Sequence, residues 1–207
     1  MTPSRRSLAT ASRSRGRPRE FDVDQALDRA VRVFSERGYH GTSISDLTRA
    51  MRLAQGSIYK AFKNKQSVFL AAFNRYRTLR AEKLRQTVGD AGTGLECLRN
   101  ALAFYVESSQ GAEGRQGCLV VGSIAELATF DKEVARHIAT ALERNEVLLA
   151  DLIRQGQEDG SIPAHVDRQA ATRMMLCLVQ GMRVVGKTSR TREDMQAVVN
   201  IAMKVLA

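Results

Sequence analysis

The chain has 207 residues, of which 43% are hydrophobic, 26% charged and 5% aromatic, with no tryptophan. This is the composition of a globular protein, and the few aromatic side chains argue against a stacking surface for single-stranded nucleic acid. Only three prolines are present, which favours long helices over a turn-rich β architecture. We therefore predict an all-α fold.

Positive charge is concentrated in the front of the chain. Residues 1–87 hold 19 of the 32 Lys and Arg side chains and 7 of the 22 acidic ones, whereas residues 88–207 are close to neutral. This asymmetry indicates a polyanionic partner for the front alone, although an anionic membrane surface would attract the same charge. The cysteines lack paired spacing, and neither a signal peptide nor a membrane-length apolar run is visible. These features predict a cytoplasmic protein without a membrane partner.

Residues 1–19 contain six arginines and no acidic residue, and we expect a disordered basic arm there. Within it, Arg15-Gly16-Arg17-Pro18 is similar to the core of an AT-hook, in which Arg15 and Arg17 would lie in a narrow A/T minor groove. A solvated tail that binds DNA without sequence preference is the alternative. Either way, the arm should raise the affinity for DNA.

Residues 20–65 are predicted to form three short helices. Apolar residues recur at helical spacing from Ala26 to Phe34, and Gly38 suits a left-handed cap that ends the first helix. The second helix begins at Thr42 or Ser43, where the spacing of Ser43 and Asp46 matches a capping box. After a break at 52–54, a third helix runs from about 55 to 62. This is the layout of a helix-turn-helix DNA-binding domain.

The third helix is the expected recognition helix, because the second helix of a helix-turn-helix places its N-terminal side chains in the major groove. It would begin with Gln55-Gly56-Ser57, and Gly56 would let the backbone approach DNA closely. Lysines that follow it, together with Tyr59, would contact phosphates.

The rest of the chain, residues 66–207, is predicted to form a second, larger helical domain. A helix at about 65–87 connects the two parts, and the glycines at 89–94 form a linker after it. Further helices are expected at about 95–109, 118–129, 132–158, 167–187 and 191–206.

The segments RGYHGTSISDL and GSIYKAFKNK, within residues 24–73, resemble the DNA-binding domain of the TetR family of transcriptional regulators (TetR/AcrR-like). The resemblance implies an N-terminal helix-turn-helix and a C-terminal helical domain for ligand binding and dimerisation. It also implies a repressor whose homodimer binds a palindromic operator in double-stranded DNA. A small-molecule effector would tilt the helix at 65–87 and release the DNA.

The resemblance assigns roles to single residues at the DNA-binding end. Thr42, with Ser43 beside it, would contact phosphate, and Lys65 would bind phosphate at the start of the connecting helix. The expected DNA-binding residues are Arg15, Arg17, Thr42, Ser43, Gln55, Gly56, Ser57, Tyr59, Lys60 and Lys65. The chain departs from the family pattern at Arg52, Ala54 and Ala61, where the family commonly has Gly, Ser and His. Ala54 cannot cap the third helix, which costs roughly 1 kcal/mol.

Two apolar stripes at the end of the chain are either core or a four-helix interface between two subunits, and the resemblance favours the interface. The candidate dimer residues are Met174, Met175, Leu178, Met182, Val198, Ile201 and Val205. The helices at 95–158 would enclose the effector, although helical apolar residues more often serve packing alone. The candidate pocket residues are Phe104, Tyr105, Val121, Ile124, Leu127, Phe130 and Ile138.

Cys118 stands at the expected start of a helix with Arg115 nearby, and both features favour a thiolate. It is either a thiol switch or a small buried residue. The histidines are isolated and no nucleophile motif or phosphate loop is present, so no catalytic residue, metal site or cofactor is expected. A nucleoid-type DNA binder without an effector and a protein-interaction adaptor remain as alternatives to a regulator.

Overall fold

The computed structural model describes residues 22–89, 92–127, 131–188 and 190–206, and within these ranges every regular element is a helix. The predicted all-α fold class is confirmed. The basic arm, with Arg15 and Arg17, lies outside the described residues. The helices are α1 (Val23–Arg37), α2 (Ile44–Met51), α3 (Gln55–Ala61), α4 (Lys65–Val88), α5 (Gly94–Ser108), α6 (Gly111–Gln116), α7 (Leu119–Leu127), α8 (Lys132–Glu158), α9 (Arg168–Val185), the 3-10 turn η1 (Gly186–Thr188) and α10 (Arg192–Lys204).

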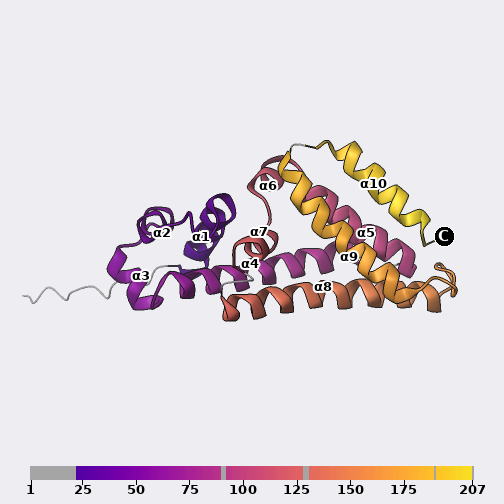
Figure 1. Ribbon diagram of the computed structural model, residues 1–207, viewed down its shortest axis with the longest axis horizontal. Coiled ribbons are helices and arrows are strands. Elements are labelled where there is room, and N and C mark those ends of the chain that lie inside the picture. Colours follow the sequence, from indigo (N-terminus) through magenta and orange to yellow (C-terminus); the bar gives the residue numbers. More distant parts are fainter. Residues whose placement is uncertain (1–21, 90–91, 128–130, 189, 207) are drawn as a thin grey trace, which may run out of the picture.

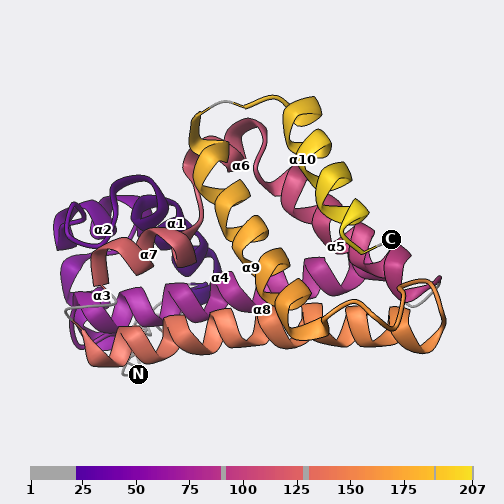
Figure 2. The same cartoon turned by 45° about the vertical axis from the view of Figure 1, so that its right-hand side comes forward.

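The molecule is elongated, with the small N-terminal helices at one end. Figure 1 shows α1, α2 and α3 gathered there, while α4 and α8 run alongside each other through the length of the molecule. At the other end α5 and α9 lie across these long helices and α10 packs against α5, and Figure 2 shows the same arrangement after a turn of the view. We call α1–α3 the head.

Local sequence signals explain where the helices of the head begin. The Ser43 hydroxyl accepts from the Asp46 N–H at 3.0 Å, and the Asp46 carboxylate accepts from the Ser43 N–H, so the predicted capping box is present. Ala54 precedes α3 without a side-chain cap, as its methyl group requires. Asn64 caps α4 by accepting from the Ser67 N–H at 2.8 Å. Polar caps therefore mark the starts of α2 and α4, whereas α3 starts without one.

The hydrophobic core beneath the head is not made by the head alone. Phe34, Leu47 and Ile58 of the head pack with Phe69 and Phe73 of α4 in one buried cluster. The same cluster includes buried residues of α7 and α8, namely Leu119, Val134 and Ile138. Helices from the back of the chain thus complete the core on which the head rests, and a second cluster lies among α4, α5, α8, α9 and α10.

An ion pair fixes the head to the long helix α4. The Arg75 guanidinium donates to both carboxylate oxygens of Asp28 on α1, at 2.6 and 2.9 Å, and contacts Asp24 at 2.9 Å. Such a bidentate pair defines orientation as well as attraction. Together with the shared core, it makes α1 and the first half of α4 one unit.

Helix α6 was not expected from the sequence. Gly111, Gly114 and Gly117 give this segment the composition of a loop. The structure nevertheless forms a helix at Gly111–Gln116, and Gly114 packs where an added Cβ would lie 2.2 Å from the Ser109 carbonyl oxygen. Glycine here serves close packing rather than flexibility.

Candidate functional site

The N-terminal half of α3 is free to meet a ligand. Gln55 and Gly56 are exposed and Ser57 is half-buried, while Ile58 anchors the helix with no exposed surface. An added Cβ at Gly56 would meet no atom within 4 Å, so space in front of the helix is open. On the following turn Tyr59, 46% exposed, and Lys60 also face solvent. These are the exposed polar residues that a groove-reading helix needs.

Three of the expected phosphate contacts are already engaged inside the protein. Thr42 is only 1% exposed and its hydroxyl donates to the Gly38 carbonyl at 2.6 Å. The Ser43 hydroxyl donates to Asp46 at 2.6 Å. The Lys65 ammonium donates to the carbonyls of Tyr39 and Thr42, both at 3.0 Å. Burial and the inward hydrogen bond make the Thr42 hydroxyl part of the turn in this structure, and its contact with phosphate stays a prediction.

The turn before α3 contains a backbone conformation that explains the family's preference for glycine. Arg52 ends α2 with φ 57° and ψ 42°, in the left-handed region. Side chains with a Cβ adopt this region at a cost of roughly 1–2 kcal/mol. Glycine at this position would adopt it without the steric cost.

A carboxylate from α7 holds the loop between α1 and α2. Glu126 accepts from the backbone N–H groups of Tyr39 and His40, at 2.8 and 3.2 Å. Gly38 has φ +74°, and a Cβ there would lie 1.8 Å from a Glu126 carboxylate oxygen. Sequence patterns gave no sign of this contact, because the two partners are 87 residues apart.

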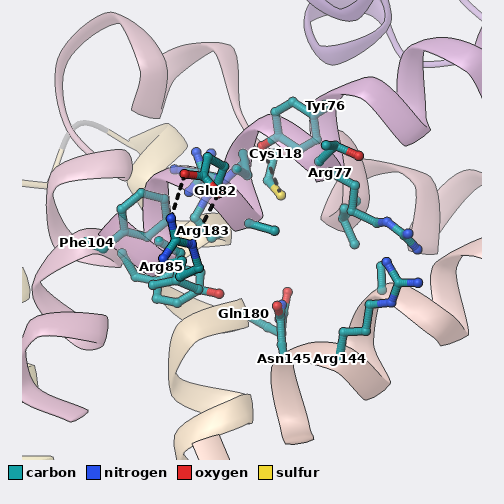
Figure 3. A pocket seen from close by; sticks show the side chains of 17 residues that line it. Tyr76, Arg77, Glu82, Arg85, Phe104, Cys118, Arg144, Asn145, Gln180 and Arg183 are labelled. Carbon is teal, nitrogen blue, oxygen red and sulfur yellow. Dashed lines mark hydrogen bonds and ion pairs between the residues drawn. The ribbon is translucent and has the colours of Figure 1, made fainter. Parts of the chain in front are cut away.

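A cavity of about 370 Å³ lies among α4, α5, α8 and α9, and its wall includes Phe104, Tyr105 and Cys118 (Figure 3). Its volume is within the range of small-molecule sites. Val121, Ile124 and Ile138 do not line it, which corrects the expected lining. Ile138 and Val121 belong to the core beneath the head, and Ile124 is exposed on α7. Phe130 lies outside the described residues, as does the side chain of Leu127.

Five arginines line the cavity wall, and the sequence analysis did not predict them. They come from α4, α8 and α9 and are Arg77, Arg80, Arg85, Arg144 and Arg183. Among the described lining residues Glu82 is the only acidic side chain, and it pairs with Arg85 at 3.1 Å. A lone arginine on a helix usually indicates a solvated face. One available signal was Arg183, which interrupts the apolar stripe of α9.

The Cys118 thiol lies in the cavity wall just before α7. Burial alone would raise its pKa, but the Arg183 guanidinium, the Val121 N–H, the Tyr76 hydroxyl and Arg80 together lower it below the ordinary value. The Tyr76 hydroxyl donates to the sulfur at 3.5 Å. The acting cations differ from the expectation: Arg115 is exposed, and its place is taken by Arg183 and Arg80. A buried thiol that faces cations and a cavity is a candidate reactive group.

The two C-terminal helices keep an uncovered apolar face. Val198 and Ile201 of α10 and Val205 directly after it are 45%, 63% and 55% exposed, and Val184 and Val185 of α9 are also exposed. The expected interface residues Met175 and Met182 are instead buried in the subunit core, because they point from α9 toward α5 and α8. Met174 and Leu178 are half-buried at its edge.

Within the described part of the chain no group of three or more His, Cys, Asp or Glu side chains could hold a metal ion. No described helix is long and apolar enough to cross a membrane. The features that do stand out are a head with an exposed recognition helix and a helical body with a cavity. This combination defines a DNA-binding transcriptional regulator of the helix-turn-helix class.

The comparison with known families agrees with this class. The model of bacterial regulatory proteins of the tetR family matches residues 26–72, and the model of the tetracyclin repressor-like C-terminal domain matches residues 94–202. The chain belongs to the TetR family, as its sequence motifs predict.

Relatives are similar over nearly the whole chain. The HTH-type transcriptional repressor ComR of Escherichia coli (strain K12) is 26% identical over 96% of this chain and 95% of its own length. The HTH-type transcriptional repressor DhaR of Mycobacterium sp. (strain GP1) is 25% identical over 87% and 89%. A solved structure of the TetR family regulator CifR, a cysteine mutant complexed with operator DNA, has 32% identity and a TM-score of 0.80. That match covers 91% of this chain and 98% of CifR.

Proposed function

We propose that the chain is a homodimeric repressor that acts by binding rather than catalysis. Its two recognition helices would enter successive major grooves of a palindromic operator, because a two-fold dimer matches a two-fold symmetric site. A small molecule in the cavity would lower the affinity for DNA. Two relatives named as repressors and a similar regulator solved on operator DNA support this reading.

The single observation that carries DNA recognition is the exposed start of α3. Gln55 and Ser57 stand at its first turn without a described intramolecular hydrogen bond from their side chains, while Ile58 fixes the helix from below. Among the described residues neither side chain stabilises the fold through a hydrogen bond. Both are therefore available for hydrogen bonds to the edges of DNA bases.

Selection of bound sequences from random duplex DNA tests the proposal. We expect enrichment of a palindrome. We expect Gln55→Ala to lower the affinity by about tenfold for each half-site, roughly 1.4 kcal/mol, and therefore by about a hundredfold for the dimer on the palindrome. Gln169→Ala, an exposed change on α9 far from the head, should bind like the parent chain. Binding without any enriched sequence would indicate a nucleoid-type protein, and no binding at low salt would indicate an adaptor.

Cys118 adds a second element to the proposal. Its lowered thiol pKa and its place in the cavity wall favour a thiol that modulates release of DNA when it is modified. Cys97 is buried and Cys177 is exposed, and neither lines the cavity. If Cys118→Ser responds to mild oxidant as the parent chain does, this part of the proposal is wrong.

A further inference from the structure

The cavity wall carries an excess of positive charge that the protein does not neutralise. Of its five arginines, Arg80 pairs with Glu113 and Arg85 pairs with Glu82. Arg77, Arg144 and Arg183 have no described carboxylate partner. A cation in a partly dry site is costly unless an anion or hydrogen-bond acceptors compensate it.

Arg183 shows how incomplete this compensation is. The side chain is 2% exposed and donates to the backbone carbonyls of Ser108 and Gly117, while its buried Nε has no described partner. The buried Nη2 of Arg80 also has no described partner. Arg183, which has no carboxylate partner among the described residues, therefore contributes a positive potential that extends into the cavity, whereas Glu113 offsets the charge of Arg80.

Arg77 on α4 and Arg144 on α8 bring two like charges together at one side of the cavity. Figure 3 shows their side chains reaching toward each other across the space between these helices. Burial lowers the pKa of Arg77, and the positive charge of Arg144 lowers it further. An anion placed between the two groups would turn this repulsion into two attractions.

The rest of the wall suits an apolar body with a few polar contacts. Phe104, Leu84, Val120 and Ala141 provide apolar surface, and the amides of Asn145 and Gln180 face the cavity as neutral partners (Figure 3). A bare inorganic anion would leave this apolar surface unused. We propose that the cavity binds a small organic carboxylate with an apolar body, whose carboxylate group lies between Arg77 and Arg144.

The inference rests on the proposed effector function and names the chemical class of the effector. It also gives the ligand a mechanical role. A carboxylate bound by both arginines would join α4, which follows α3 directly along the chain, to α8, whose first turns pack beneath the head. The ligand would shift the position of α4 only if it binds one spacing of these two helices better than the other.

Calorimetric titration of the full chain tests the ligand class. The probes are butyrate, octanoate, dodecanoate and 4-phenylbutyrate, each beside its primary amide, together with inorganic phosphate. We expect at least one carboxylate to bind at least tenfold more tightly than its amide and than phosphate. If every amide matches its acid, if phosphate binds as tightly as the acids, or if no compound binds, the inference is wrong.

Two variants of α8 with the same change of charge test the position. Arg144→Gln removes the exposed partner in the cavity wall, and Arg136→Gln removes an exposed arginine two turns away that does not line the cavity. We expect Arg144→Gln to weaken carboxylate binding by about tenfold or more, the loss of a hydrogen bond to a charged group. Arg136→Gln should bind as the parent chain does. Equal binding by both variants would contradict the assigned position.

Release of the selected operator is measured separately, so that the two proposals can fail independently. A carboxylate that binds in the titration but leaves the DNA complex intact contradicts the effector function and leaves the ligand class standing. Release by neutral compounds alone, with no carboxylate binding, contradicts the ligand class and leaves the effector function standing.

Discussion

At the scale of single residues, burial and the neighbouring groups act in opposite directions on the pKa of Cys118. Desolvation disfavours the thiolate, whereas Arg183, Arg80 and the hydrogen bonds from Val121 and Tyr76 stabilise it, and the pKa is lowered on balance. The same burial raises the pKa of Tyr105 to about 12, so this phenol stays protonated at neutral pH. Cys118 is thus a cavity thiol whose thiolate form is favoured by the surrounding cations and hydrogen bonds.

Alkylation of Cys118 by iodoacetamide should rise at a lower pH than alkylation of free cysteine. The thiolate attacks the carbon that bears iodine and iodide leaves, so the rate follows the thiolate fraction, which a lowered pKa increases at neutral pH. The measurement uses a Cys97→Ala/Cys177→Ser background, in which Cys118 is the remaining thiol. Further change of Cys118 to serine in that background should abolish the reaction. A profile that coincides with that of free cysteine would contradict the assignment.

At the scale of elements, α7 connects the cavity to the head. Cys118 precedes its first residue, and Glu126 near its last turn holds the loop that carries Tyr39 and His40. The same loop supplies the Tyr39 carbonyl that accepts from Lys65. A change at the cavity end of α7 therefore has a short path of direct contacts to the turn before α2.

Removal of the Glu126 carboxylate should loosen this connection. Glu126→Ala leaves two backbone N–H groups without their acceptor, and we expect a loss of about 1–2 kcal/mol in the free energy of unfolding. Glu126→Gln keeps an acceptor oxygen and should lose less. Gly38→Ala should act on the same contact, because its Cβ would occupy the place of the carboxylate.

Denaturant unfolding of these variants checks the coupling. The combined Gly38→Ala/Glu126→Ala variant should lose less stability than the two single losses added together, since both changes break one contact. Additive losses would show that Gly38 and Glu126 act separately.

Local sequence signals predicted most of the helices, but they could not predict contacts between residues far apart in the sequence. The Ser43–Asp46 capping box and the long helix at 132–158 were read from adjacent residues, and both are present. The cavity was only partly predicted, because its wall joins arginines from helices far apart in sequence, such as Arg77 and Arg144. Periodicity separates buried from exposed faces, but it does not tell a packed apolar face from one that surrounds a cavity.

At the scale of the whole molecule, the uncovered face of α9 and α10 should hold two subunits together. Ile201, with 63% of its surface exposed, has the largest exposed fraction among the exposed large hydrophobic residues of this face. Ile201→Glu would place a charge in a dry interface, and we expect a monomer in sedimentation at micromolar concentration. Asn200→Glu adds the same charge on an exposed position beside it and should remain dimeric. A parent chain that sediments as a monomer would contradict the proposed dimer.

The bidentate ion pair between Arg75 and Asp28 should make the head follow any tilt of α4. Because Arg75 and the shared core join α1 to α4, we expect the head to move together with that helix. Arg77 lies twelve residues from Lys65 along α4, a length of about 18 Å at 1.5 Å per residue. A tilt of about 10° pivoting at Arg77 would swing the start of α4 through ~3 Å, close to the rise of one base pair. In a dimer, opposite movements of the two heads would change the distance between the recognition helices, which would then no longer match the spacing of successive major grooves.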